Sequence, residues 1–473
     1  MKLNSLNIKQ AKEGLKKKDF SSVELTKACL DQIKKLEGKL NAFVTVTEKQ
    51  ALEQASAADK LISSGQDLPL LGIPIAIKDN FSTIGVKTTA SSKVLEDYIP
   101  PYDATVVAKL KAAGMILLGK TNMDAWAHGS STETSDYGST KNPWNIKHLP
   151  GGSSGGSAAS VAADEVIAAI GSETAGSIRQ PASWCGVVGL KPTYGRVSRY
   201  GVIAMGSSLD SPGPITKTVE DSALILEVLA GVDRNDATTS PSPIKNYSQK
   251  LNKNIKELKI GISKEYFIEG IDKEVKAVVE QAVKKLGKLG AKIDNIKLFD
   301  PKYAIDVYTI IQRSEVSSNL ARYDGIRYGN GRDFFKDEAK RRIMFGTYAL
   351  SSGYYDQYYN KAQQVRTVII DDFAKAFEKV DVIIAPTSPS LALPVGATKD
   401  TSMFGEIADV LVEPSSIAGL AGINIPVGFS KSGLPIGMQI IGPQFSEELV
   451  LSVAYEYEKQ TQNEEWRKLK PSL

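Results

Sequence analysis

Two serines and a lysine are the residues of this chain best suited to chemistry. Residues 151–157 read Gly-Gly-Ser-Ser-Gly-Gly-Ser, which includes Ser153, and residues 176–181 read Gly-Ser-Ile-Arg-Gln-Pro, which includes Ser177. Upstream, the apolar run 73–77 ends in Lys78. A serine hydroxyl is a weak nucleophile and needs a base to take its proton during attack. Two serines and a neutral lysine can therefore perform acyl transfer without histidine.

Lysine is the remaining candidate for the base. The only histidines are His128 and His148, and neither lies in a recognisable triad context, so we take both as structural. A lysine with the ordinary pKa of about 10.4 is protonated at neutral pH, and burial must lower that pKa before it can act as a base. Lys78, at the end of a buried strand, has this environment in principle, whereas most lysines after a strand simply reach solvent.

Glycines around the two serines allow tight turns and a close approach of the backbone to a substrate. The competing interpretation is a phosphate-binding loop, but Ser157 rather than lysine follows Gly156. An oxyanion that develops during acyl transfer needs backbone N–H donors. We expect these donors in the turn formed by Thr174, Ala175, Gly176 and Ser177.

Hydrophobic periodicity predicts an α/β core that positions these residues. Ser21 and Glu24 form a capping-box pattern before a helical repeat, and 51–62 predicts a second helix. Short apolar runs at 73–78, 115–118 and 166–170 alternate with helical patterns at 105–113 and 158–163. The glycine-rich segment therefore lies just before a helix and is not a linker.

The second half of the chain predicts a helical elaboration of this core. Tyrosine-rich helical patterns run from about residue 300 to residue 379. Strand character returns at 381–386, and segments 423–429 and 434–441 predict a hairpin. We interpret residues 1–473 as a single domain.

Composition indicates a soluble globular protein. The chain is 42% hydrophobic and 24% charged, and its net charge of +4 is too small for a nucleic-acid footprint by itself. Two cysteines, Cys29 and Cys185, do not indicate disulfides, and with two histidines they lack zinc-ligand spacing. The chain has no signal core and no run of the roughly 20 apolar residues needed for a bilayer, so we expect a cytoplasmic protein without a metal.

The glycine-rich stretch and the following Gly-Ser-Ile-Arg resemble the hallmark of the amidase signature family. This resemblance implies the amidase signature fold, a large mixed β-sheet covered by helices on both faces, with a helical insertion. It implies that Ser177 is the nucleophile and that Lys78 is the base. It also implies that Ser153 relays the proton between them and follows a cis peptide bond.

One branch of this family, the glutaminase subunits of tRNA-dependent amidotransferases, is similar over nearly the whole chain. The stretches that carry this similarity are 71–80, 129–135, 186–201, 318–325 and 340–344. The similarity implies glutamine hydrolysis, with ammonia passing to a B subunit that activates mischarged tRNA with ATP and Mg. It also implies a heterotrimer joined by a small C subunit, with tRNA bound mainly by the B subunit. No cofactor is expected in this chain itself.

Local alignment with that branch places its glutamine-binding residues at Tyr308, Arg342 and Asp409. Arg342 can form a bidentate hydrogen bond with the α-carboxylate, and Asp409 can bind the α-ammonium. Tyr308 can form a hydrogen bond or pack against the substrate. The choice of Arg342 over the neighbouring Arg341 stays open.

Two departures from the family pattern leave alternatives open. Ala175 stands where glycine is usual and restricts the turn expected to carry the oxyanion donors. Ala125, Trp126 and His128 differ from the usual residues of their stretch, which makes His128 a candidate for substrate contact. The alternatives are a stand-alone amidase for another small amide, and a non-catalytic binding subunit if Ala175 distorts the turn. The tRNA that is amidated, for glutamine, asparagine or both, is not determined by this sequence.

Overall fold

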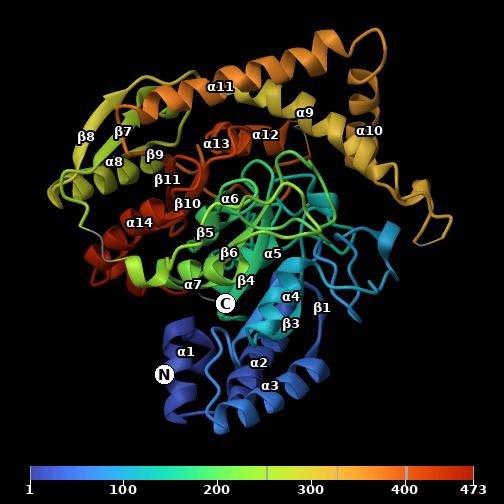
Figure 1. Ribbon diagram of the computed structural model, residues 1–473, viewed down its shortest axis with the longest axis vertical. Helices are drawn as coiled ribbons and strands as arrows, with labels where there is room; N and C mark the ends of the chain where they lie inside the picture. The colour runs from blue at the N-terminus through green and yellow to red at the C-terminus, as the bar shows by residue number, and fades with distance from the viewer. Residues whose placement is uncertain (1, 252–253, 328, 400–402, 472) are drawn as a thin grey trace.

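One mixed β-sheet runs through the molecule (Figure 1). The computed structural model describes residues 2–251, 254–327, 329–399, 403–471 and 473. Within these residues the sheet has 11 strands, in the order β1-β3-β2-β4-β6-β5-β10-β11-β9-β7-β8. Their bounds are β1 Phe43–Val46, β2 Pro74–Lys78, β3 Ile116–Thr121, β4 Ala168–Glu173, β5 Val188–Lys191, β6 Ser211–Thr216, β7 Lys259–Ser263, β8 Lys292–Ile296, β9 Val382–Pro386, β10 Ala421–Phe429 and β11 Pro435–Gly442.

The direction of neighbouring strands varies across this sheet. Strand β2 is parallel to β3 and β4, and β7 is parallel to β8 and β9, whereas the pairs between these two groups are antiparallel. Strands β10 and β11 form the predicted hairpin. The predicted large mixed α/β sheet is confirmed.

Most predicted helices are present, with small shifts at their ends. The helices are α1 Ile8–Lys17, α2 Ser22–Leu40, α3 Glu48–Ser63, α4 Thr105–Ala112, α5 Gly155–Ala162, α6 Arg179–Cys185, α7 Val219–Leu229, α8 Lys273–Lys288, α9 Lys302–Leu320, α10 Asp337–Ala349, α11 Lys361–Phe377, α12 Phe404–Asp409, α13 Glu413–Ile417 and α14 Glu447–Thr461. Ser21 and Glu24 form the expected capping box of α2. Gly114, with φ +90°, follows the end of α4. The helix predicted from residue 158 begins at Gly155, because the glycines after the first serines already adopt helical backbone.

Helices cover both faces of the sheet. Gly422 of β10 faces α6, since a Cβ there would lie 2.9 Å from Arg179. The next residue, Ile423, points to the other face because side chains alternate along a strand. Ile423 belongs to the same apolar cluster as Val450 and Leu451 of α14. The two sides of β10 therefore pack against different helices.

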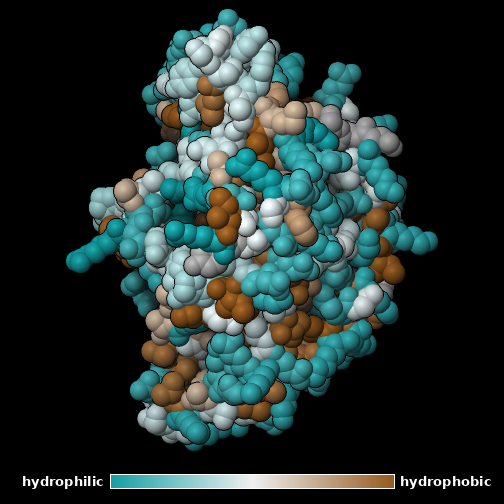
Figure 2. Space-filling model, turned by 90° about the vertical axis from the view of Figure 1, so that its right-hand side faces the viewer, coloured by the Kyte–Doolittle hydropathy of each residue, from teal (hydrophilic) through white to brown (hydrophobic). Residues whose placement is uncertain are grey.

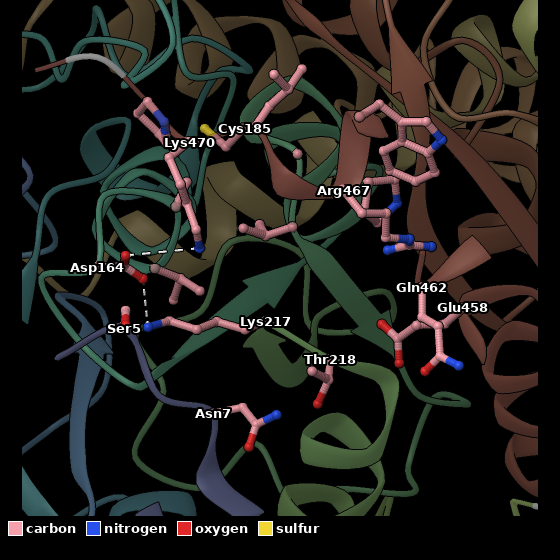
Figure 3. Close-up of a pocket in the computed structure, with 18 of the residues that line it drawn as sticks. Ser5, Asn7, Asp164, Cys185, Lys217, Thr218, Glu458, Gln462, Arg467 and Lys470 are labelled. Carbon is pink, nitrogen blue, oxygen red and sulfur yellow. Dashed lines mark ion pairs between the residues drawn. The ribbon is translucent and has the colours of Figure 1, made fainter. Parts of the chain in front are cut away.

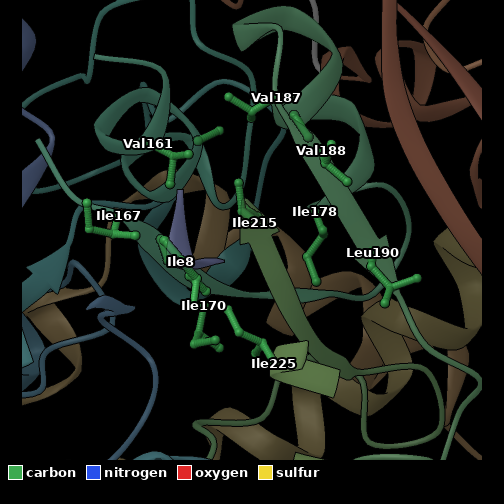
Figure 4. Packing of buried hydrophobic residues seen from close by; sticks show 14 of the residues in the cluster. Ile8, Val161, Ile167, Ile170, Ile178, Val187, Val188, Leu190, Ile215 and Ile225 are labelled. Carbon is green, nitrogen blue, oxygen red and sulfur yellow. The ribbon is translucent and has the colours of Figure 1, made fainter. Parts of the chain in front are cut away.

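Branched aliphatic side chains from neighbouring strands fill the main core (Figure 4). Ile170 of β4, Ile215 of β6 and Leu190 of β5 are fully buried. Ile225 reaches the same cluster from α7. Cys29 of α2 is also buried in this core.

The region predicted to be a helical elaboration contains α9, α10 and α11, which lie together at the top of Figure 1. Helix α9 packs against both α10 and α11, and it also contacts α12 and α13. Tyr308 is on α9, Arg342 is on α10 and Asp409 ends α12. These three residues, which are distant in sequence, are thereby carried by helices that contact one another.

The surface in Figure 2 shows hydrophobic residues in separate patches among hydrophilic ones. In the described part of the chain, none of the helices is both long enough and apolar enough to cross a membrane.

Candidate active site

The candidate active site begins where two neighbouring parallel strands end. Lys78 is the last residue of β2, and β4 ends at Glu173 beside it. The turn after β4 carries Ser177, and the loop before α5 carries Ser153. Because parallel strands end at the same edge of a sheet, residues distant in sequence meet there.

The Lys78 amine lies against Ser153 inside the protein. Lys78 Nζ is 2.7 Å from Ser153 Oγ and donates a hydrogen bond of 3.0 Å to the carbonyl oxygen of Ser172. Both Lys78 and Ser153 are fully buried. Burial lowers the pKa of Lys78 from 10.5 to about 7, against the opposing effect of Asp124, Asp210 and Glu173. A neutral amine can donate to Ser172 and still accept a proton from Ser153.

The two serine loops are held to each other by their backbones. The N–H of Ser154 donates to the carbonyl oxygen of Ser177 at 3.2 Å, and Gln180 accepts from the N–H of Gly152 at 3.0 Å. The peptide bond between Gly152 and Ser153 is cis, as the family resemblance implies. Gly152 has no room for a side chain, because a Cβ would lie 2.1 Å from the Asp124 carboxylate. The backbone N–H of Asp124 also donates to the carbonyl oxygen of Ser153 at 3.3 Å, so Asp124 helps to hold the loop that presents Ser153.

A buried ion pair fixes the turn that carries Ser177. Glu173 and Arg179, both fully buried, are paired at 2.6 Å, and Glu173 also accepts from the backbone N–H groups of Ile178 and Arg179. Arg179 and the hydroxyl of Ser416 both donate to the carbonyl oxygen of Ala175. In a planar trans peptide, the following N–H, that of Gly176, points the opposite way.

This turn contains backbone N–H groups that have no acceptor in the described protein. In the described part of the chain, the N–H groups of Ala175, Gly176 and Ser177 donate to no protein acceptor. All three residues are buried. Fixed, unpaired N–H groups of this kind can stabilise a developing negative charge.

Ala175 fits this turn without backbone strain. Its φ lies outside the left-handed region, so no glycine is required there. Its side chain is buried in an apolar cluster. The position that does require glycine is Gly176, where a Cβ would lie 2.4 Å from Asp409 Oδ1 and 2.5 Å from Val412. The concern raised by Ala175 therefore has no structural basis.

Of the three predicted glutamine-binding residues, Asp409 is the one that lies against this turn. Its Oδ2 accepts a 2.7 Å hydrogen bond from Ser130, while its Oδ1 is buried and has no partner within the described residues. Burial raises the pKa of the Asp409 carboxyl well above its usual range. Tyr308 is close enough to interact electrostatically with both Asp409 and Arg342. The structure thus places Asp409 beside Gly176, with Tyr308 within electrostatic range of both Asp409 and Arg342.

The structure distinguishes Arg342 from Arg341. Arg342 is 3% exposed, whereas the side chain of Arg341 is 48% exposed. Arg342 donates from Nε to Glu338 at 2.6 Å and from Nη1 to Gln312 at 2.9 Å. These contacts still leave guanidinium N–H groups for a ligand, because arginine has five. Arg342 is therefore the arginine that faces the interior.

Sequence reasoning missed the groups that orient these side chains. Glu406 lies 3.0 Å from Arg313 and 3.6 Å from Arg342, so two buried arginines share one carboxylate. Glu338 precedes Arg342 by four residues, a helical spacing that could have indicated the pair. The role of Ser130 in holding Asp409 had no signal in the sequence, because the two residues are far apart in the chain.

A cavity of about 550 Å³ lies away from these residues (Figure 3). It borders Ala162 and Cys185, the last residues of α5 and α6, whereas Ser153 and Ser177 precede the first turns of these helices. Asp164 pairs there with Lys217 and Lys470. Among the described residues, no group of three or more histidine, cysteine, aspartate and glutamate side chains is placed to hold a metal ion.

Comparison with known proteins agrees with this arrangement. A family model described as amidase matches residues 24–451. The chain belongs to the amidase family. The A subunit of the glutamyl-tRNA(Gln) amidotransferase of Thermoanaerobacter pseudethanolicus is 52% identical, covering 97% of this chain and 97% of its own length.

Two solved structures show how widely this amidase fold is used. The A subunit of the glutamyl-tRNA(Gln) amidotransferase from Thermotoga maritima has a TM-score of 0.80 and 40% identity, and the match covers 97% of this chain and 95% of that one. A 6-aminohexanoate cyclic dimer hydrolase has a TM-score of 0.89 and 26% identity, covering 99% of both chains. The family and the fold implied by the sequence are confirmed.

Proposed function

We propose that this chain is the glutaminase subunit of a tRNA-dependent amidotransferase. The observation that carries the proposal is the buried contact of 2.7 Å between Lys78 Nζ and Ser153 Oγ beside the Ser177 turn. A relative of nearly the same length that is 52% identical and named as such a subunit supports the choice among amidases.

In the proposed reaction, neutral Lys78 takes the proton of Ser153 while Ser153 takes the proton of Ser177. Ser177 Oγ then attacks the side-chain amide carbon of glutamine, and the oxyanion forms beside the N–H groups of Ala175, Gly176 and Ser177. The C–N bond breaks, the relayed proton goes to the leaving nitrogen, and ammonia departs. Water cleaves the resulting γ-glutamyl ester by the same relay, which releases glutamate and restores Ser177.

Tyr308, Arg342 and Asp409 are proposed to hold the amino-acid end of glutamine. Asp409 Oδ1 is unpartnered in the described structure and lies next to Gly176, so it is suited to accept from the α-ammonium. The positive charge of that ammonium would compensate for the burial of the Asp409 carboxylate. Arg342 retains free N–H groups for the α-carboxylate. Tyr308 interacts electrostatically with both Arg342 and Asp409.

The ammonia is proposed to serve partner subunits. The name of the similar subunits implies a multi-subunit amidotransferase, and we assign a B subunit that binds mischarged tRNA and uses ATP and Mg. A small C subunit would complete a cytoplasmic heterotrimer. The product would be the amidated form of Glu-tRNA(Gln), and of Asp-tRNA(Asn) if the partner accepts it. This chain needs no cofactor for the steps proposed above.

A stand-alone amidase for another small amide is the second candidate. Lys78, Ser153 and Ser177 all belong to this chain, so the acyl-transfer chemistry requires no residue from a partner. The similar 6-aminohexanoate cyclic dimer hydrolase shows that the fold also occurs in a hydrolase of another amide. The binding-only alternative depended on a turn distorted by Ala175, and the φ of Ala175 lies outside the left-handed region that would require glycine.

Ammonia release separates these candidates. The chain, copurified with the partners of its host, is assayed with L-glutamine, L-asparagine and a simple aliphatic amide. A strong preference for L-glutamine, raised by mischarged tRNA and ATP, supports the amidotransferase assignment. Comparable release from the simple amide without partner dependence supports the stand-alone amidase. Substantial turnover by Ser177→Ala would refute both.

A further inference from the structure

The cavity beside Arg342 contains a buried histidine that the proposed mechanism does not use. His128 is 1% exposed, and neither of its ring nitrogens has a hydrogen-bond partner within the described residues. Leaving two polar atoms unpaired inside a protein costs free energy, and such groups normally have an explanation in a ligand or in function. His128 is also one of the residues that depart from the family pattern.

His128 lines a cavity of about 770 Å³ with groups of both charges. The other residues that matter there are Ser130, Phe335, Glu338, Arg342 and Glu406. Trp126 is close to His128 in sequence. Its ring centroid lies 4.8 Å from that of Tyr323 and 5.3 Å from that of Phe335. This aromatic wall helps to position the segment that carries His128.

The cavity reaches the catalytic turn through one residue. Ser130, two positions after His128, lines the cavity and donates to Asp409. Asp409 in turn lies against Gly176, the neighbour of Ser177. A glutamine whose side chain reaches Ser177 would therefore have its amino-acid end at Asp409 and at the side of the cavity lined by His128 and Arg342.

The charge state of His128 suits a hydrogen-bond donor to an anion. Burial, together with Arg342 and Arg313, holds the pKa of His128 well below its usual value, so the free imidazole is neutral. A neutral imidazole has one N–H donor and one acceptor nitrogen. Arg342, although paired with Glu338 and Glu406, keeps guanidinium N–H groups that can bind a carboxylate, and the imidazole N–H would add a directed contact.

We infer that His128 donates a hydrogen bond to the α-carboxylate of the substrate, and so helps to distinguish an amino-acid amide from a simple amide. This inference rests on the proposed glutaminase function, because it uses the same pocket. It adds a specificity residue that the family resemblance did not assign.

Substrate selectivity tests this inference in the copurified complex. Removing a hydrogen bond to a charged group lowers kcat/KM by about tenfold to a hundredfold. His128→Met should therefore raise KM for L-glutamine by about this factor. It should change KM for the simple amide by less than about twofold. His128→Gln, whose side-chain N–H can replace the donor, should recover part of the loss. The matched control is His148→Gln, at the only other histidine of the sequence. It should leave KM unchanged for both substrates.

The inference is overturned if His128→Met leaves KM for L-glutamine unchanged, or if it raises KM for both substrates by the same factor. The wild-type complex tests the proposed function separately. If that complex shows no preference for L-glutamine over the simple amide, the function itself fails. If it shows the preference and His128→Met retains it, only the role of His128 fails.

A spectroscopic measurement keeps the test valid if the His128 variants do not fold. The complex is prepared with isotope-labelled histidine in this chain and with Ser177→Ala to prevent turnover. The two imidazoles then give separate ring signals, which His148→Gln assigns. L-Glutamine should shift the signals of His128 and leave those of His148 unchanged, while the simple amide shifts neither. An unshifted His128 with saturating L-glutamine contradicts the inference.

Discussion

Lowering the pH should switch off this enzyme by protonating Lys78. Burial lowers the pKa of Lys78 to about 7, and the proposed reaction uses only its neutral form. The amine is neutral above this pKa and charged below it. Activity should therefore rise with pH through neutrality and then level off.

For a simple amide, which does not use the Asp409 carboxyl, the size of the effect follows from the titration of Lys78 alone. At pH 6, one unit below a pKa of about 7, roughly one Lys78 in ten is neutral, and at pH 8 roughly nine in ten are. We expect kcat/KM to change about tenfold per pH unit on the acid side and to be nearly constant above about pH 8. Lys78→Arg, which keeps a charge at all these pH values, should be inactive throughout.

The assay is ammonia release from L-glutamine and from a simple amide between about pH 5 and pH 9. Lys191 provides a matched control, because burial also lowers its pKa to about 7 but it donates to the carbonyl oxygens of Pro192 and Leu420. Lys191→Met should keep the midpoint of the profile. A flat profile in the wild type, or a midpoint that moves with Lys191→Met, would refute the assignment of Lys78.

Three further predictions concern the surroundings of the triad. Ala175→Gly should keep ammonia release within about twofold, because Ala175 needs no left-handed backbone; a large gain would mean that alanine impairs the turn. Asp409→Asn should raise KM for L-glutamine by about tenfold or more and spare a simple amide, and equal effects on both in steady-state kinetics would contradict its role. Arg179→Met should lower the free energy of unfolding by about 3–5 kcal/mol, because it leaves the buried Glu173 carboxylate without its partner. Urea unfolding measures this change, and an unchanged midpoint would contradict it.

Local patterns were sufficient for the elements that present the catalytic residues. The apolar run before Lys78 predicted β2, and the capping box at Ser21 predicted the start of α2, because both signals depend on residues close in sequence. The boundary before α5 was less accurate, since glycine favours no single backbone conformation. The family resemblance, rather than periodicity, supplied the mixed sheet and the roles of the two serines.

Contacts between distant segments could not be read from the sequence. Arg341 and Arg342 are adjacent in sequence, and the packing of α10 against α9 and the contact with Glu406 of α12 accompany the burial of Arg342. The fixation of the Ala175 carbonyl by Arg179 and Ser416 likewise joins residues far apart in the chain. The catalytic and binding roles themselves remain predictions that kinetics must test.

The central claim is that Ser177 forms a γ-glutamyl ester with L-glutamine. The most direct measurement is mass spectrometry of the chain after rapid acid quenching during turnover, followed by peptide mapping. We expect a glutamyl adduct on the peptide that contains Ser177, and no adduct in Ser177→Ala. An adduct on another residue, or glutamine hydrolysis that persists in Ser177→Ala, would contradict the claim.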